Sequence, residues 1–173
     1  MMEIRLLEAR DGGAYWQLRL QSLRDEPQAF SSSYETALAM PDAEKQKTFS
    51  SRITGPDNFI VGAFEGDKLA GMAGFFRETG PKTHHKAMLW GMYVAPEARH
   101  RGTGQALLKQ LIKQASSIEG VEQIYLGVIT TQVAARSLYV RLGFEVYGNE
   151  PRALKMGRDY FDEELMVLRL NRT

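Results

Sequence analysis

The residues from Val94 to Gly104, with the sequence VAPEARHRGTG, constrain the fold of this chain more than any other stretch. A β-rich apolar run ends at Val94, and a basic, glycine-spaced loop follows it. A helix is expected directly afterwards, because apolar residues then recur at helical spacing, at Leu107, Leu108, Leu111, Ile112 and Ala115. A strand that leads through such a loop into a helix presents backbone N–H groups and a helix N-terminus to a phosphate.

The loop by itself leaves two interpretations open. Gly102 and Gly104 permit close ligand approach that a Cβ would block, the helix start carries unsatisfied N–H donors, and the basic side chains are Arg99, His100 and Arg101. In the other interpretation the loop is a solvated turn, because glycine-rich turns before helices are common. It has neither the Gly-Lys-Ser/Thr ending of a Walker P-loop nor the three-glycine spacing of the dinucleotide fingerprint.

Apolar patterning along the chain predicts an α/β fold with a mixed sheet, in a single domain covering residues 1–173. Strands are expected at 3–8, 59–65, 68–78, 87–94, 123–130, 144–148 and 164–170. Helices are expected after Asp11, after Asp42, after the glycine loop and at 132–142, with a further helical segment after the loop at 29–35. A long loop rich in charge and glycine is expected to join the last two strands.

Composition excludes several classes of protein. Cysteine is absent, which rules out disulfides, thiolate metal sites and a cysteine nucleophile, and which fits a reducing cytoplasm. The net charge is +1, far below the basic excess of a dedicated nucleic-acid binder. We therefore expect a cytoplasmic protein with no nucleic-acid partner.

Membrane and metal binding also lack support. The longest apolar run, residues 87–95, is too short to span a bilayer, and the N-terminus has no secretory signal pattern. The histidines number three, and their spacing suits no metal site. We expect neither a membrane partner nor a bound metal.

Two separated motifs carry a resemblance to a known family. Arg99-x-x-Gly102-x-Gly104, preceded by residues 92–97, resembles the pyrophosphate-binding signature of the GNAT superfamily of acetyl-CoA-dependent N-acetyltransferases. The run Gln132-x-x-Ala135-x-x-Leu138-Tyr139-x-x-x-Gly143-Phe144 is similar to the second signature of that superfamily. Residues 147–154 further resemble a bacterial branch whose substrates are mostly unassigned.

The resemblance implies a fold and a cofactor site. The fold is a central, largely antiparallel twisted sheet flanked by about four helices, with strands that splay apart at the cofactor cleft. Acetyl-CoA is the implied cosubstrate, with the pantetheine arm along the backbone of residues 92–94 and the pyrophosphate on N–H groups of residues 100–105. The implied cofactor-binding residues are Met92, Tyr93, Val94, Arg99, His100, Arg101, Gly102, Thr103, Gly104, Gln105 and Gln132.

Tyr139 stands at the position that protonates or steadies the leaving thiolate of CoA in that family. A phenol with a pKa of about 10 is a plausible acid for a thiolate whose acid has a pKa of about 8.5. The alternative is a core tyrosine on the apolar face of its helix, next to Leu138.

The sequence departs from the family pattern at two positions. Gln132 replaces the usual asparagine, which changes the reach of the amide. Met88 stands where some members carry a glutamate base, and it cannot take a proton. Candidates for the general base are Glu35 and His85, with Glu78 and His84 as further options; a surface charge and a solvated turn are the respective alternatives for Glu35 and His85.

Gly91 and Gly127 lie inside the strands before and after the loop. A glycine within a strand often marks a bulge or a close backbone approach. A bulge at Gly91 would help the strands to splay and leave backbone groups free for the cofactor.

The residues and the resemblance together predict an N-acetyltransferase that moves acetyl from acetyl-CoA to a primary amine by direct attack in a ternary complex. The rival function is a non-catalytic acyl-CoA-binding or regulatory module, which Met88 favours and Tyr139 opposes. The acceptor is a small-molecule or peptide amine. An exposed edge strand near the C-terminus is compatible with a homodimer.

Overall fold

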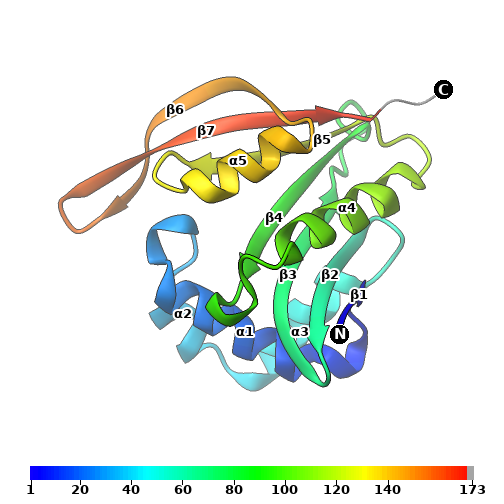
Figure 1. Cartoon of the computed structure of the whole chain (residues 1–173), viewed down its shortest axis with the longest axis vertical. Coiled ribbons are helices and arrows are strands. Elements are labelled where there is room, and N and C mark those ends of the chain that lie inside the picture. The colour runs from blue at the N-terminus through cyan, green and yellow to red at the C-terminus, as the bar shows by residue number, and fades with distance from the viewer. Residues whose placement is uncertain (171–173) are drawn as a thin grey trace.

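One mixed sheet organises the computed structural model, which describes residues 1–170 (Figure 1). Its strands lie in the order β1-β2-β3-β4-β5-β7-β6. Only the neighbours β4 and β5 pair in parallel among the described strands. The strands are β1 (Met2–Leu6), β2 (Asn58–Glu65), β3 (Lys68–Arg77), β4 (Lys86–Val94), β5 (Gln123–Ile129), β6 (Glu145–Met156) and β7 (Asp159–Arg169).

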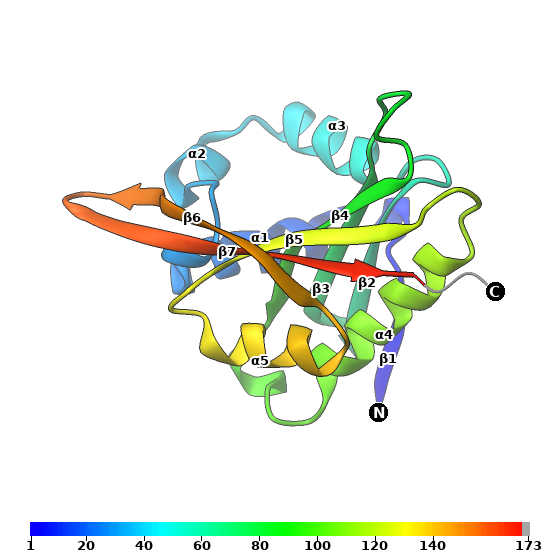
Figure 2. The ribbon, with the colours of Figure 1, turned by 90° about the horizontal axis from the view of Figure 1, so that it is seen from above.

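Helices cover both faces of the sheet (Figure 2). The helices are α1 (Gly12–Asp25), α2 (Tyr34–Ala39), α3 (Asp42–Ile53), α4 (Thr103–Ser116) and α5 (Val133–Arg141). Side chains alternate between the faces along a strand, so β2 sends Val61 into the core beneath α4 and Ile60 into the core beneath α1 and α3. The structure confirms the predicted mixed α/β sheet.

Strands β4 and β5 pair only over a short stretch and then separate. Residues 86–88 of β4 pair with residues 123–125 of β5, and no pairing follows beyond them. Gly91 has a φ of +62°, and the register between β3 and β4 shifts between Met72 and Gly74. The predicted bulge at Gly91 therefore lies where the strands begin to splay.

The predicted loop between the last two strands is wrong. Instead, β6 and β7 form a long hairpin, with Met156 paired to Asp159 across a tight turn at Gly157, whose φ is +60°. Most of β6 is exposed on both faces, so its residues are polar and charged without being a loop. Pro151 fits because the register shifts between Glu150 and Leu154.

Two helix starts also differ from expectation. Pro41, and not Asp42, is the N-cap of α3, and Asp42 is its first residue. The carboxylate of Asp11 does not cap α1, because it accepts hydrogen bonds from Arg5 and from the N–H of Glu8. A short further helix, α2, is capped by Ser33, whose hydroxyl accepts a hydrogen bond from the Thr36 N–H at 3.1 Å.

Within residues 1–170, no helix has both the length and the apolar character needed to cross a membrane.

Candidate active site

The loop between β4 and α4 is held in shape by hydrogen bonds to its own backbone. The Thr103 hydroxyl, which is buried, donates to the Ala98 carbonyl oxygen at 2.8 Å, and Nε of Arg99 donates to the Val94 carbonyl oxygen at 2.8 Å. His100 and Gly102 both adopt positive φ, of 60° and 77°. The chain therefore turns back sharply and starts α4 directly beneath the end of β4.

This turn leaves a set of backbone donors without protein partners. None of the N–H groups from His100 to Gln105 donates a hydrogen bond to the described residues, and the first helical bond runs from Ala106 to Gly102. The N-cap of α4 is Gly102, which has no side chain to cap the helix. The donors and the positive end of the helix dipole together favour an anion at this point.

A cavity of about 340 Å³, which we call the cofactor cavity, opens beside the turn. All the predicted cofactor residues except Arg101 line it. It is also lined by residues that the sequence analysis did not select, namely Glu26, Ala134, Ala135, Leu138 and Arg141. Ala134 and Arg141 belong to the second motif as variable positions, whereas nothing in the sequence indicated that Glu26, directly after α1, reaches this site.

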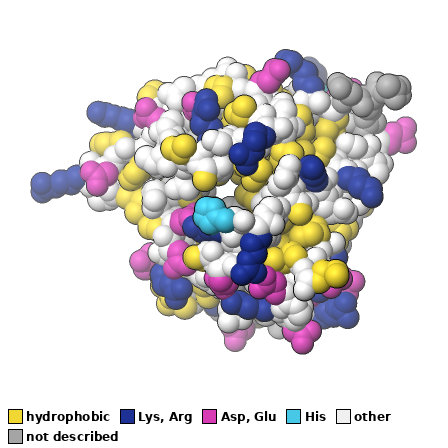
Figure 3. Space-filling view, viewed as in Figure 1, with side chains coloured by type: hydrophobic (Ala, Val, Ile, Leu, Met, Phe, Trp, Pro, Cys, Tyr) yellow, Lys and Arg dark blue, Asp and Glu magenta, His cyan; other side chains and the backbone are white. Residues whose placement is uncertain are grey.

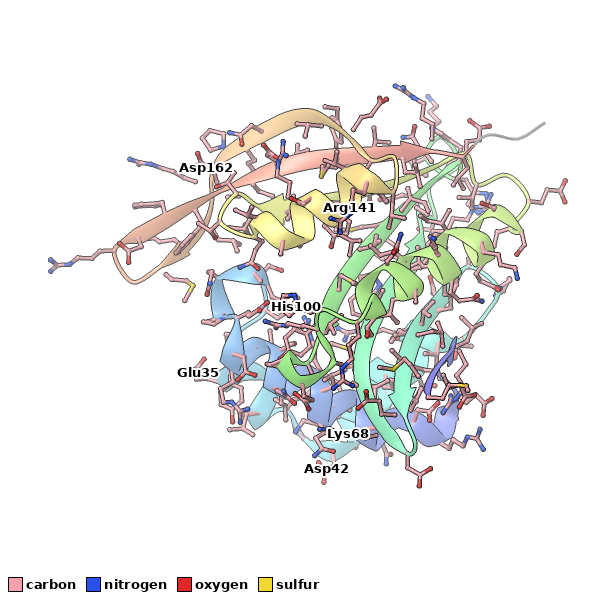
Figure 4. All side chains as sticks on the ribbon, in the orientation of Figure 1. Glu35, Asp42, Lys68, His100, Arg141 and Asp162 are labelled. Atoms are coloured by element: carbon pink, nitrogen blue, oxygen red, sulfur yellow. The ribbon has the colours of Figure 1, made fainter. Side chains whose placement is uncertain are left out.

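The charges of the two predicted loop arginines are both paired with carboxylates of the protein. Nη2 of Arg99 donates to Oε1 of Glu26 at 2.7 Å. Arg101 pairs with Glu65 at 2.7 Å and faces β2. His100 and Arg141 form no ion pair with the described residues, and they lie on the two sides of the gap between the α4 loop and α5 (Figure 4).

Tyr93 contributes to the cofactor cavity through its backbone. Its ring is buried against the α1 side of the sheet, and its hydroxyl donates to Asp25 at 3.2 Å. Burial, followed by the nearby charge of Asp25, raises the pKa of Tyr93 to about 12. The phenol therefore stays neutral at physiological pH, and it serves packing.

A second, smaller cavity of about 100 Å³ continues from the first one into the splay between β4 and β5. We call it the transfer cavity. It shares Glu26, Met92, Gln132 and Ala135 with the cofactor cavity and is also lined by Ala29, Phe30, Leu89, Trp90, Gly91, Gly127, Val128, Ile129 and Tyr139. Tyr139 lines the transfer cavity and not the cofactor cavity, and the four shared residues lie between the two.

Tyr139 is 5% exposed and packs edge-on against Phe144, with ring centroids 5.7 Å apart. Its hydroxyl has no hydrogen-bond partner within the described part of the chain. Burial raises the pKa of this phenol above its ordinary value. The protonated hydroxyl on the wall of the transfer cavity is thus available to a ligand.

The two candidate bases are not brought to either cavity. Glu35 is exposed on α2 and points away from the site (Figure 4). His85 lies in the turn before the paired end of β4 and lines neither cavity. Of the further options, Glu78 is bonded to the Tyr125 hydroxyl, on the same paired part of the sheet.

Two other charged residues, which the sequence analysis missed, lie behind the wall of the transfer cavity. Glu163 on β7 fills the space next to Gly127, where a Cβ would overlap its carboxyl group. Arg19 on α1 is only 6% exposed, and its Nη1 lies 3.9 Å from the position of a Cβ on Gly91. Gly91 and Gly127 predicted a bulge or a close approach to the backbone, but the sequence did not indicate that Arg19 and Glu163 are the side chains that lie there.

The surface around the site carries both signs of charge. Basic and acidic side chains are interspersed over this face, which is hollowed near its centre beside a histidine (Figure 3). Within residues 1–170 no group of three or more His, Asp or Glu side chains is arranged to hold a metal ion.

Comparison with known proteins gives the class to which this fold and loop belong. The profile of the acetyltransferase (GNAT) family matches residues 20–144, and the chain belongs to that family. The resemblance inferred from the two motifs is therefore confirmed.

Individual proteins add detail. The N-alpha-acetyltransferase RimI of Mycobacterium tuberculosis is 35% identical over 100 residues, which are 58% of this chain and 60% of RimI. The matched segment is only 28% of the length of a second curated relative. Among solved structures, a GNAT acetyltransferase from Streptococcus pneumoniae superposes with a TM-score of 0.87 at 20% identity, over 98% of this chain and 100% of the other.

A further solved structure, the putative acetyltransferase yncA from Salmonella typhimurium, contains acetyl-CoA as its cofactor. It has a TM-score of 0.78 at 21% identity and covers 100% of this chain and 96% of its own. At this level of identity the likeness establishes the fold.

Proposed function

We propose that this protein is an N-acetyltransferase that moves the acetyl group of acetyl-CoA to a primary amine. The observation that carries the proposal is the connection between two features: the turn of unpaired N–H groups at residues 100–105, and the hydroxyl of Tyr139 in the adjoining cavity. The family membership and the acetyl-CoA in the Salmonella neighbour support it.

The cofactor would lie along the shared wall of the two cavities. Its pyrophosphate would accept hydrogen bonds from the turn, where an anion also meets the positive end of α4. Its pantetheine arm would run beside Met92, Tyr93 and Val94, whose backbone faces the splay because β5 has already separated from β4. The thioester would then reach the transfer cavity near Tyr139.

The reaction would be direct attack of the amine on the thioester carbonyl. A C–N bond forms, the C–S bond breaks, and the leaving thiolate takes a proton from the Tyr139 hydroxyl. The proton that the nitrogen loses on becoming an amide restores Tyr139 through solvent. Burial raises the pKa of Tyr139, so the phenol keeps its proton until the thiolate forms beside it. The chain has no cysteine to form a thioester intermediate, which agrees with attack within a ternary complex.

Two measurements test the proposal. In calorimetry, acetyl-CoA is expected to bind with a micromolar Kd, about −8 kcal/mol. In a free-thiol assay with a panel of amines, at least one primary amine should release CoA well above the rate of hydrolysis. Binding without any amine-dependent release would support the rival function, a non-catalytic acyl-CoA-binding module; no binding would exclude both.

We also propose that the chain forms a homodimer through the β6–β7 hairpin. β6 is an edge strand of the sheet, and large apolar side chains on the hairpin are exposed, namely Val146, Tyr147, Met156 and Tyr160. An open strand edge with apolar neighbours favours pairing with another strand. Light scattering after size-exclusion chromatography should give twice the 19.5 kDa mass of the chain, and a monomer at all concentrations would contradict the proposal.

A further inference from the structure

Two glycines line the transfer cavity from the two splayed strands, and each has a charged side chain behind it. Gly91 belongs to β4 and Gly127 to β5. Behind Gly91 is the guanidinium of Arg19, and behind Gly127 is the carboxyl group of Glu163. A cation therefore lies behind one of these glycines and a carboxylate behind the other, although neither side chain is itself among the residues that line the cavity. The carboxylate that does line it, Glu26, is already paired with Arg99.

Arg19 is a buried cation without a protein partner. Its Nη1 is shielded from water and has no hydrogen-bond partner among the described residues, which is true of no other buried side-chain donor or acceptor there. The charge of Arg52 repels it, and its guanidinium lies over the ring of Phe30, 5.0 Å from the ring centroid. A buried charge costs several kcal/mol unless it is paired, so an unpaired one marks a position where a ligand anion can complete the site.

The opening to Arg19 is created by the glycine. Of all the described atoms outside residues 90–92, Nη1 of Arg19 is the only one within 4 Å of the position that a Gly91 Cβ would take. Gly91 and Phe30 both line the transfer cavity. An anionic group in that cavity can therefore approach the guanidinium through the space that a side chain at position 91 would fill.

Glu163 is arranged to meet a cation. Its carboxyl group is half-buried, lies against Gly127, and forms no ion pair or hydrogen bond with the described residues. Its partner across the β6–β7 hairpin is another carboxylate, Glu150. Burial, followed by repulsion from Glu150, raises the pKa of Glu163, so this group accepts a proton more readily than an ordinary glutamate.

We infer that the acceptor is a small amino acid, a primary amine that also carries a carboxylate, which pairs with Arg19 while its ammonium group faces Glu163. This inference rests on the proposed function. Glu163 takes one proton from the ammonium, and the free amine attacks the acetyl carbon. The C–N bond forms, the C–S bond breaks, and Tyr139 protonates the thiolate. The new amide nitrogen loses its second proton, which restores Tyr139 through solvent, and Glu163 releases its own proton to water.

The size of the transfer cavity agrees with a small acceptor. Its volume of about 100 Å³ is less than a third of the 340 Å³ of the cofactor cavity. That space suits the acetyl group and the amine end of a short molecule. A peptide N-terminus is the contrasting acceptor, because its first carboxyl group is an amide and cannot pair with Arg19.

The test compares each amino acid with its own carboxamide. The panel consists of glycine, β-alanine, γ-aminobutyrate and the common α-amino acids, each beside the matched amide, with kcat/KM measured by thiol release. The parent protein should prefer at least one acid over its amide by about 100-fold. In Arg19→Gln this ratio should fall to near one, and Arg19→Lys should recover part of it. A folding defect would lower both rates and leave the ratio unchanged.

Further variants separate the two charged residues. Gly91→Ala should also reduce the ratio of acid to amide, because it fills the opening to Arg19. Glu163→Gln should lower kcat at least 50-fold. If Glu163 is the base, kcat of the parent should rise with pH as Glu163 loses its proton, and this rise should be absent in Glu163→Gln. The preference for the acid over its amide should stay high. Arg24→Gln on the exposed side of α1 and Glu145→Gln on β6 are the matched controls, and both should behave as the parent does.

The outcomes distinguish this inference from the proposed function. Transfer to amides or peptides at rates equal to those of the acids would overturn the inference and leave the proposed function standing. If no acetyl transfer is detected, binding of the same amino acids is measured by calorimetric titration into the CoA-saturated protein. Binding that is lost in Arg19→Gln would then support the amino acid site while the proposed function failed, and no binding would overturn the inference too.

Discussion

Nη2 of Arg99 donates to Oε1 of Glu26 at 2.7 Å, and this ion pair ties the end of α1 to the loop that precedes α4. Arg99 also holds the Val94 carbonyl oxygen, so one side chain joins the strand, the loop and the first helix. The basic residue of the loop motif thus shapes the turn, and the backbone N–H groups are left to meet the ligand.

Removing either member of this pair should therefore weaken acetyl-CoA binding indirectly. Both side chains are about a third exposed, so solvent screening limits the effect of Glu26→Gln or Arg99→Gln to about 1 kcal/mol, roughly a fivefold rise in Kd by calorimetry. The double variant should lose less than the sum of the two. Arg101→Gln is the comparison, because its partner Glu65 lies outside the cavity, and its Kd should match the parent's. A large effect at Arg101 with none at Arg99 would show that the assignment of the two arginines is reversed.

Gly102 and Gly104 should resist substitution for different physical reasons. Gly102 has a φ of +77° with open space around it, so Gly102→Ala strains the backbone by about 1–2 kcal/mol. At Gly104 an added Cβ would lie 3.0 Å from Cδ2 of Leu138 and 3.3 Å from Cε of Met92, so Gly104→Leu pushes α4 away from the cavity wall. We expect at least a tenfold rise in the Kd of acetyl-CoA for each.

The control for these glycines is Gly13→Ala in α1. No atom lies within 4 Å of its Cβ position, and alanine is the better helix former by up to about 1 kcal/mol. This variant should melt at the same temperature as the parent or higher, with an unchanged Kd. Parent-like binding by both loop variants would mean that the loop does not hold the cofactor.

Tyr139→Phe should reduce turnover strongly and change acetyl-CoA binding little. The hydroxyl has no partner within the described residues, so its removal leaves no unsatisfied protein group, and we expect a loss of 10²-fold or more in kcat with less than a twofold change in Kd. Because its pKa is raised, the acid should not titrate below about pH 10. Tyr160→Phe, at an exposed position, is the control. If kcat survives in Tyr139→Phe, the thiolate takes its proton from elsewhere.

Asp11 should make stability depend on pH in the acid range. Its buried carboxylate accepts hydrogen bonds from Nη1 and Nη2 of Arg5 at 2.7 and 2.9 Å and from the Glu8 N–H. These contacts, led by the hydrogen bond from Arg5, lower the pKa of Asp11 in the folded state. Its contribution is therefore complete above the ordinary value of about 3.9 and is lost as the pH falls through the lower folded-state value.

Urea unfolding of Asp11→Asn should show a loss of about 2 kcal/mol at pH 7 that shrinks as the pH approaches 3. Glu119→Gln, at an exposed position on the loop before β5, should unfold as the parent does across this range. An Asp11→Asn deficit that stays constant with pH would mean that lost packing, and not the charge, is responsible.

The paired end of the sheet and the phosphate turn could be predicted because their signals are local. Alternating apolar residues mark β2 and β3, and the Gly66-Asp67 turn between them is a short-range hairpin signal. The β6–β7 hairpin was missed for an equally local reason. A ribbon exposed on both faces has no apolar alternation, and a run of charged residues without alternation predicts a loop.

In the site, too, some features follow from neighbouring residues in the sequence and others depend on distant ones. The backbone donors of residues 100–105 follow from glycine spacing and a helix start, and both are properties of adjacent residues. Arg19 comes from α1, Glu26 from directly after it and Glu163 from β7, all distant in sequence from the loop. Arg19 lies on a helix whose buried face is otherwise mostly apolar, so composition alone predicted nothing for it.

By itself, the sequence determined the mixed sheet, the turn of free N–H groups and the family, because each depends on the spacing of neighbouring residues along the chain. Only the tertiary structure decided which charges meet at the transfer cavity. Gly91 and Gly127 leave space where other residues would have side chains. The packing of α1 and β7 against the splayed strands sets which charged side chains, Arg19 and Glu163, lie at that space.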